Sequence, residues 1–404
     1  SNFIAGVNAG NSITSGGNFN TAVGDEAGTA ITTGDNNTLF GYGSGDALDT
    51  AVNNTAIGHN ALTADTKGSY NVAIGKGTLA SQNFTSATDS FNVAVGSSAG
   101  NDITTGIDNT LIGANAGDAL TDADYNTAIG FESLSSDTLG SRSVALGYFA
   151  LRNQNFTSAT DSYNTALGFA AGEATTTGIN NTFIGGLSGD ANTTGGSNVA
   201  LGKSSFSDNT TGSNNVAVGD AALNANTTAS NNVAVGKNAL LVNTTGAQNV
   251  GIGSLSLTAN TTGANHTAVG YGTLDANTTG GANTAMGRDS LGSNTTASAN
   301  TAFGYGSLRD NTTGSSNVGL GYLALEENTT GGNNTAVGFQ ALEENTTASN
   351  NVAVGYFALR KNTTGSLNTA IGVLAADALT TGDSNTAIGY AALSSDTKGE
   401  RAIA

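Results

Sequence analysis

The stretch Asn334 to Asn350 reads Asn-Thr-Ala-Val-Gly-Phe-Gln-Ala-Leu-Glu-Glu-Asn-Thr-Thr-Ala-Ser-Asn, and it is one copy of the repeat that builds this chain of 404 residues. Its opening pentad, Asn-(Thr/Val)-Ala-(Ile/Val/Leu)-Gly, recurs 23 times, with first residues from Asn2 to Asn385. We number positions from the pentad Asn as position 1, and we call the residues at one position in successive repeats a column. A fixed period of this kind is typical of solenoid architectures.

The columns indicate short strands and turns. Position 2 is Thr or Val in nearly every repeat, and such β-branched residues favour strands. Position 5 is Gly in all 23 repeats, which predicts a positive φ angle or a very close backbone approach. Position 4 is a large apolar residue in every repeat except the first, where Ala5 stands, and position 9 is usually Leu. We expect positions 4 and 9 to form the core, with positions 3 and 5 as a smooth stripe of Ala and Gly on the opposite face.

The spacing predicts the fold. Almost every repeat has the same length, as the successive first residues Asn215, Asn232 and Asn249 show. The apolar positions 4 and 9 are five residues apart, whereas apolar residues on one face of a helix recur three or four residues apart. Two short strands per repeat, joined by Gly and Asn turns, fit instead. The fold class predicted is therefore all-β, a parallel β-solenoid (β-roll or β-helix) of 17-residue coils.

A substitution pattern supports one large inward side chain per coil on the segment after the pentad. Where position 9 is Gly or Ala, position 12 is often apolar, which predicts packing at constant volume. Two repeats, with Gly172 and Gly189 at position 9, lack an apolar residue at position 12. The pairs that follow the rule are Gly10 with Ile13, Gly28 with Ile31, Gly45 with Leu48, Gly100 with Ile103, Gly117 with Leu120, and Ala376 with Leu379.

The repeats form one array over residues 1–404. Residues 1–19 are the first coil, residues 20–163 are two 72-residue modules of four coils each, and residues 164–404 are uniform 17-residue coils. Each module contains one longer, 21-residue coil. At position 3, the usual Ala is replaced by Leu39, Leu111 and Phe183, which follow one another at the length of one module.

Composition excludes several classes. The chain has no Cys, so disulfide scaffolds, thiol catalysis and Cys-ligated zinc are excluded. Its net charge of −18 argues against nucleic acid as a partner, and no apolar run is long enough for membrane insertion. The core of such a small coil is thin. We therefore expect a homotrimer, and the alternative is a flat monomeric solenoid with closely packed sheets.

Neither catalysis nor a cofactor is predicted. The two histidines, His59 and His266, stand alone, and the 30 acidic residues show no reproducible pairing for acid–base work. We expect the protein not to be an enzyme and to hold no metal or other cofactor. Calcium is the alternative, bound through the turn acids Asp46, Asp118, Asp122 and Asp124, although the calcium-roll pattern is absent.

Three columns or loops are candidates for surface contact. Position 6 holds ten aromatic residues, which either stack or contact another chain, or else bind glycans. The 21-residue coils add loops at 82–91 and 154–163, where a plain surface bulge is the alternative to a binding feature. The candidate surface or glycan contacts are Phe84, Phe156, Tyr271, Tyr305, Tyr322 and Tyr356.

Eleven Asn-Thr-Thr triplets, with first residues from Asn192 to Asn362, follow one another at 17-residue spacing. We interpret them as a turn ladder, in which Asn tolerates left-handed backbone and stacked amides bond one another. The alternative is a row of N-glycan acceptors. The paired Thr columns also suggest an ice-binding surface, with one Thr per coil facing outward.

The pentad and turn together resemble a known group. Asn334-Thr-Ala-Val-Gly338-Phe-Gln-Ala-Leu342, followed by Asn345-Thr-Thr, is similar to repeats of phage-type tail-fibre proteins. The pentad also resembles the head repeats of YadA-like trimeric autotransporter adhesins. The resemblance implies a trimeric, elongated attachment fibre without catalysis, extracellular on a virion or cell surface, with a host glycan or receptor as partner. The alternatives are a bacterial cell-surface trimeric adhesin or a self-assembling extracellular filament.

Overall fold

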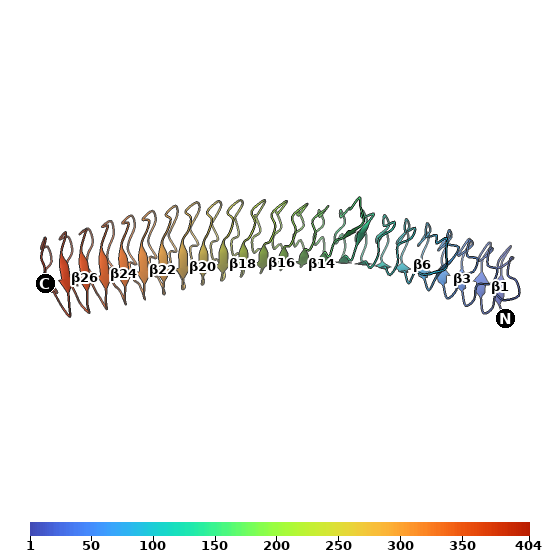
Figure 1. Ribbon diagram of the computed structural model, residues 1–404, viewed down its shortest axis with the longest axis horizontal. Coiled ribbons are helices and arrows are strands. Elements are labelled where there is room, and N and C mark those ends of the chain that lie inside the picture. Colours follow the sequence, from blue (N-terminus) through green and yellow to red (C-terminus); the bar gives the residue numbers. More distant parts are fainter. The chain divides into compact units, whose positions relative to one another are not determined.

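The computed structural model describes residues 1–404 and consists of strands and turns, with no helix (Figure 1). It divides into two compact units, an N-terminal unit (Ser1–Val199) and a C-terminal unit (Ala200–Ala404). Each unit is a parallel β-solenoid, which confirms the predicted fold class. The division between them falls within strand β16 (Val199–Leu201).

Positions 2 to 4 of every repeat form a three-residue strand. In the N-terminal unit these are β1 (Phe3–Ala5), β2 (Thr21–Val23), β3 (Thr38–Phe40), β4 (Thr55–Ile57), β6 (Val72–Ile74), β8 (Val93–Val95), β9 (Thr110–Ile112), β10 (Thr127–Ile129), β12 (Val144–Leu146), β14 (Thr165–Leu167) and β15 (Thr182–Ile184). In the C-terminal unit they are β17 (Val216–Val218), β18 (Val233–Val235), β19 (Val250–Ile252), β20 (Thr267–Val269), β21 (Thr284–Met286), β22 (Thr301–Phe303), β23 (Val318–Leu320), β24 (Thr335–Val337), β25 (Val352–Val354), β26 (Thr369–Ile371) and β27 (Thr386–Ile388).

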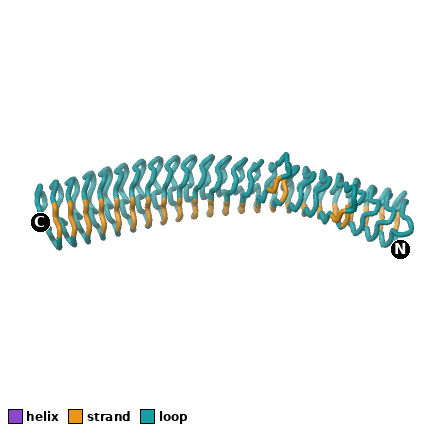
Figure 2. The backbone as a smooth tube through the Cα atoms, in the orientation of Figure 1, coloured by secondary structure: helices purple, strands orange, loops and turns teal.

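Neighbouring strands pair in parallel, with each residue opposite its own column. In β17 and β18, Ala217 pairs with Ala234, and in β18 and β19 the partner of Ala234 is Gly251. Figure 2 shows these strands along one side of each unit, with turns around the rest of the coil. The longer coils add two small parallel pairs, β5 (Gly68–Ser69) with β7 (Thr88–Asp89) and β11 (Gly140–Ser141) with β13 (Thr160–Asp161).

The prediction of two strands per repeat was wrong, because each 17-residue coil has only one. Positions 7 and 9 instead adopt left-handed backbone, as at Ala221 and Leu223, both with φ of 52°. This conformation costs an L-residue roughly 1–2 kcal/mol. Every coil contains these left-handed residues because few residues are available to reverse the chain direction around a narrow core.

The predicted core assignment was also wrong for the strands. Position 3, not position 4, faces inward: Ala217 is fully buried, whereas Met286 and Phe303 at position 4 are 36% and 38% exposed. The inward space at position 3 is very small. Where Gly251 occupies it, even a Cβ would lie 2.8 Å from Oγ of Ser256. The coil therefore admits Ala inside and turns the large position-4 residues outward, while the position-9 leucines, such as Leu223, are buried as predicted.

The position-5 glycines meet both predicted requirements. Gly219 has a φ of 136°, and a Cβ placed on it would lie 2.6 Å from the carbonyl oxygen of Gly236 in the next coil. The coils stack so closely along this column that no side chain fits.

The exchange of volume between positions 9 and 12 is confirmed. A Cβ on Gly28 would lie 2.8 Å from Cδ1 of Ile31, which is fully buried. The two repeats that break the rule have a third source of volume. The ring of Phe183, at position 3, approaches the Cβ position of Gly172 to 2.7 Å and that of Gly189 to 2.5 Å.

The turn asparagines form the predicted ladder. Asn260 Nδ2 donates to Oδ1 of Asn243 in the preceding coil at 2.7 Å, and to the carbonyl oxygen of Gly263 at 2.9 Å. The triplet asparagines are fully buried, so N-glycans on them are incompatible with the fold. The pentad asparagines form a second buried ladder, in which the Asn249 backbone N–H donates to Oδ1 of Asn232 at 2.9 Å.

Candidate functional site

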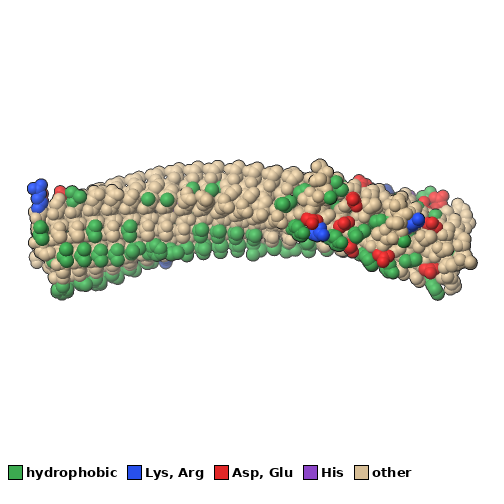
Figure 3. Space-filling view, in the orientation of Figure 1, with side chains coloured by type: hydrophobic (Ala, Val, Ile, Leu, Met, Phe, Trp, Pro, Cys, Tyr) green, Lys and Arg blue, Asp and Glu red, His purple; other side chains and the backbone are tan.

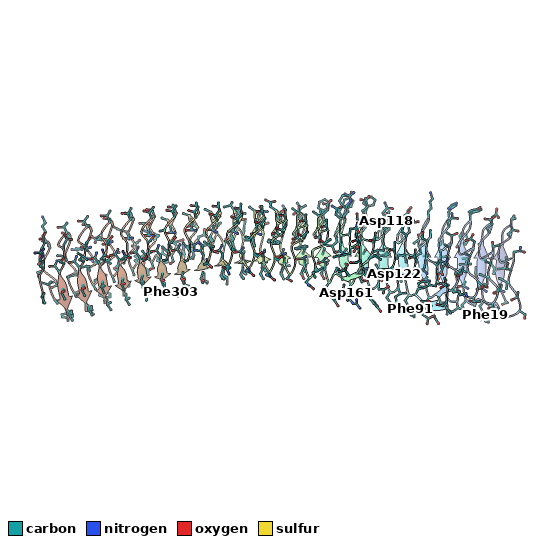
Figure 4. The ribbon with its side chains drawn as sticks, turned by 45° about the horizontal axis from the view of Figure 1, so that its top comes forward. Phe19, Phe91, Asp118, Asp122, Asp161 and Phe303 are labelled. Atoms are coloured by element: carbon teal, nitrogen blue, oxygen red, sulfur yellow. The ribbon has the colours of Figure 1, made fainter.

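The most extensive surface feature is the outer face of the strands, formed by positions 2 and 4, which we call the outer strand face. It contains Thr, Val and larger apolar residues and no charged residue in any coil. In the C-terminal unit, Ile252, Phe303 and Ile371 are each more than one third exposed. Figure 3 shows this face as a green strip following the strands, and in Figure 4 the labelled Phe303 lies on the outer side of β22.

Position 6 carries a ladder of stacked side chains. Ring centroids of Tyr305, Tyr322, Phe339 and Tyr356 follow one another at 5.4, 5.2 and 5.3 Å, with planes within 15° of parallel. In the coil before Tyr305, Arg288 takes the aromatic residue's place, and its guanidinium lies 6.0 Å from that ring. The predicted structural stacking is confirmed, and Arg serves in it as a flat substitute for a ring.

The stacking limits how these rings meet a ligand. Tyr271, Tyr305, Tyr322 and Tyr356 are between 41% and 51% exposed, so the candidate contacts of this column are on the surface. Sugars pack against the faces of aromatic rings. Both faces of Tyr322 are covered by its neighbours, so a glycan reaching this ring meets its edge and hydroxyl group.

The two candidates in the 21-residue coils do not lie on the surface. Phe84 and Phe156 are only 6% and 5% exposed, so the prediction that they contact glycans was wrong. Their backbone N–H groups donate to a buried carboxylate one coil earlier, at 3.3 Å from Phe84 to Asp65 and at 3.0 Å from Phe156 to Asp137. The additional residues of each 21-residue coil therefore pack over this carboxylate and do not extend into solvent as a binding loop.

Both carboxylate oxygens of the buried Asp65 accept hydrogen bonds from the protein. Gln82 Nε2 donates to Asp65 Oδ2 at 2.6 Å, and the Gly68 backbone N–H donates to Oδ1 at 2.9 Å. Burial raises the pKa of Asp65, while these hydrogen bonds act in the opposite direction. Asp65 takes the ladder position that Asn occupies in later coils, and its role is structural.

The acids proposed for calcium do not converge. Asp46 and Asp118 stand at position 10, and Asp122 and Asp124 stand at positions 14 and 16. No three acidic or His side chains gather as a metal site. Burial, with smaller effects of Asp102 and Glu132, raises the pKa of Asp118 to about 6. The surface has no pocket that encloses any of these groups.

Both histidines have the structural environments expected of them. The ring of His59 stacks on Tyr42 with centroids 5.3 Å apart. His266 replaces a pentad Asn and is buried, with Nε2 2.6 Å from the carbonyl oxygen of Gly280 and Nδ1 accepting from the Asn283 backbone N–H at 3.3 Å. Neither histidine has an acidic or nucleophilic partner for catalysis.

Sequence reasoning missed the outer strand face, although a signal was present. Position 3 is Ala in 17 of the 23 repeats, whereas position 4 is divided among several larger residues from Val to Phe. Close-packed interiors tolerate little change in volume. The dominance of one small residue therefore marks position 3 as the inward column, and the mixture of large residues marks position 4 as the outward one.

No protein-family model matches the chain, and no curated protein matches it. The structure contains no helix that could span a membrane.

Proposed function

We propose that this chain is the structural shaft of an extracellular or virion attachment fibre, assembled as a homotrimer through the outer strand face. The observation that carries the proposal is the apolar, uncharged surface that positions 2 and 4 repeat in every coil. Exposed apolar patches larger than a few hundred Å² are uncommon on monomeric proteins and mark interaction sites.

A second copy of the same chain matches this surface. Both copies have the same 17-residue period, so each coil of one meets a coil of the other along the whole face. Burial of apolar surface stabilises such a contact by about 25 cal/mol per Å². The absence of charge on the face removes the desolvation cost that an unpaired buried charge would add.

Two outward columns suit three copies. In a closed threefold arrangement every copy contacts two neighbours, and the contact is between different patches of the two surfaces. The smaller Thr and Val of position 2, such as Val250, then face the larger residues of position 4, such as Ile252, on the next copy. The Ala and Gly stripe is not part of this contact, because position 3 faces the interior of the coil.

The shaft has a mechanical role. Its Asn ladders and position-5 glycines hold the coils at a constant spacing, and exposed Tyr edges along position 6 offer weak contacts to host glycans. The protein needs no cofactor and no catalytic group for this task.

Charge on the outer strand face tests the proposal. The double variant Ile252→Glu and Met286→Glu is expected to dissociate the trimer, because assembly would bury the new carboxylates. Light scattering measures the mass. The matched control, Ala276→Glu and Ser293→Glu, adds the same charge at position 11 and is expected to keep the wild-type mass. A double variant that retains the trimer would refute the interface.

A further inference from the structure

The ten Asn-Thr-Thr turns of the C-terminal unit, and the turn Leu379-Thr380-Thr381 that follows them, each present one Thr to solvent. Position 13 is half-buried and position 14 is exposed. We call the eleven exposed residues the outer threonine column: Thr211, Thr228, Thr245, Thr262, Thr279, Thr296, Thr313, Thr330, Thr347, Thr364 and Thr381. At an inter-strand spacing of ~4.8 Å, this column is about 50 Å long.

The two Thr positions differ in their hydrogen bonds. At position 13, the Thr261 hydroxyl donates to the carbonyl oxygen of Thr278 in the next coil at 3.0 Å, and this bond recurs along the unit. The hydroxyls of the outer threonine column have no hydrogen-bond partner in the protein. Each hydroxyl is therefore available to water as one donor and two acceptor sites, at a spacing set by the backbone ladder.

Charged residues are absent from this side of the coil over most of the C-terminal unit. Between residues 209 and 382, the 14 Asp, Glu, Lys and Arg residues all occupy positions 6, 7, 10 and 11. The corresponding column of the N-terminal unit is interrupted by Lys67, Asp122 and Leu139. Between residues 209 and 382, the C-terminal unit thus combines a regular row of free hydroxyls and methyl groups with an uncharged surrounding. Charge returns beyond it, with Asp383 at position 16 and Lys398 at position 14 of the last two coils.

A periodic, neutral array of this kind can hold water in a repeating arrangement before any partner arrives. Immobilising a water molecule costs up to about 2 kcal/mol in lost entropy. A rigid array of hydroxyls orders the water before binding, so the binding step does not include that cost. We propose that the outer threonine column binds the surface of ice crystals through the water that it orders. The outer strand face is less suited, because its position-4 residues include side chains as uneven as Met286 and Phe303.

Thermal hysteresis of the full-length protein tests this proposal. We expect the wild type to lower the freezing point below the melting point, whereas an equal concentration of a protein that does not bind ice leaves no gap. The double variant Thr279→Lys and Thr296→Lys places two ammonium groups in the middle of the column and is expected to abolish the gap. Circular dichroism spectra matching the wild type establish that the solenoid is intact.

The control variant Ala276→Lys and Ser293→Lys puts the same charges on the same two coils at position 11, among the native charges, and is expected to keep the gap. A wild type without hysteresis overturns the proposal, and so does a control that loses as much activity as the column variant. The test is independent of the fibre proposal, since a monomeric wild type with hysteresis would refute the trimer alone.

Discussion

The ring of Phe183 occupies the space beside Gly189, 2.5 Å from where a Cβ on that glycine would stand. Coils with Leu at position 9 have Ala or Gly at position 3, whereas this coil has the large residue at position 3 and Gly at position 9. Where position 9 is Gly, the space beside it in the interior of the solenoid is therefore filled by a large side chain at position 3, at position 12 or at both. This relationship makes the core testable by paired substitutions.

Phe183→Ala is expected to destabilise the protein by about 3–5 kcal/mol, because it empties a fully buried site beside two glycines. Chemical denaturation followed by circular dichroism measures the loss. Phe303→Ala removes the same side chain from the outer strand face and is expected to cost much less within an isolated chain.

Gly189→Leu is expected to restore much of the stability lost in Phe183→Ala, since the coil then has the Ala and Leu arrangement of its neighbours. Leu is acceptable there because Gly189 has a φ of 58°, close to the 52° of Leu223. If the double variant were no more stable than Phe183→Ala, the volume exchange would be wrong.

Gly219→Ala is expected to destabilise the stack by more than about 1 kcal/mol, the scale on which Ala at an incompatible positive φ begins to cost. The added Cβ also meets the Gly236 carbonyl oxygen at 2.6 Å, so two coils must separate. The shift in denaturation midpoint checks the prediction, and an unchanged midpoint would contradict the close approach.

Ala221→Gly, at position 7 of the same coil, is expected to have the opposite sign. Ala221 has left-handed backbone with φ of 52° and a half-exposed side chain, so glycine relieves strain and loses little packing. We expect a gain of up to about 1 kcal/mol in the free energy of unfolding. A loss of stability would show that the side chain contributes more than the strain costs.

His266 makes stability depend on pH. Burial lowers its pKa below the ordinary 6.5, because a charged ring is disfavoured inside the Asn ladder. As the pH falls below about 6.5, the unfolded chain binds the proton first, so stability present above that pH is lost. Thermal melts at pH 7.5 and pH 5 are expected to differ less in His266→Asn, and an equal difference in both proteins would contradict this role.

Much of the fold was predictable because each column of the repeat obeys one physical constraint. The position-5 glycines, the strands before them and the exchange between positions 9 and 12 are all visible in the sequence. The direction of the strand side chains was not predicted, because large apolar residues such as Met286 suggest a core when the width of the coil is unknown. The burial of Phe84 was also missed, since it depends on a carboxylate contributed by the preceding coil.

The mass of the wild-type protein in solution tests most directly whether the outer strand face is an interface between copies. Light scattering at several concentrations measures it without labels. We predict a single species of three times the 39.6 kDa of one chain. A stable species of 39.6 kDa over the same concentrations would contradict the trimeric fibre.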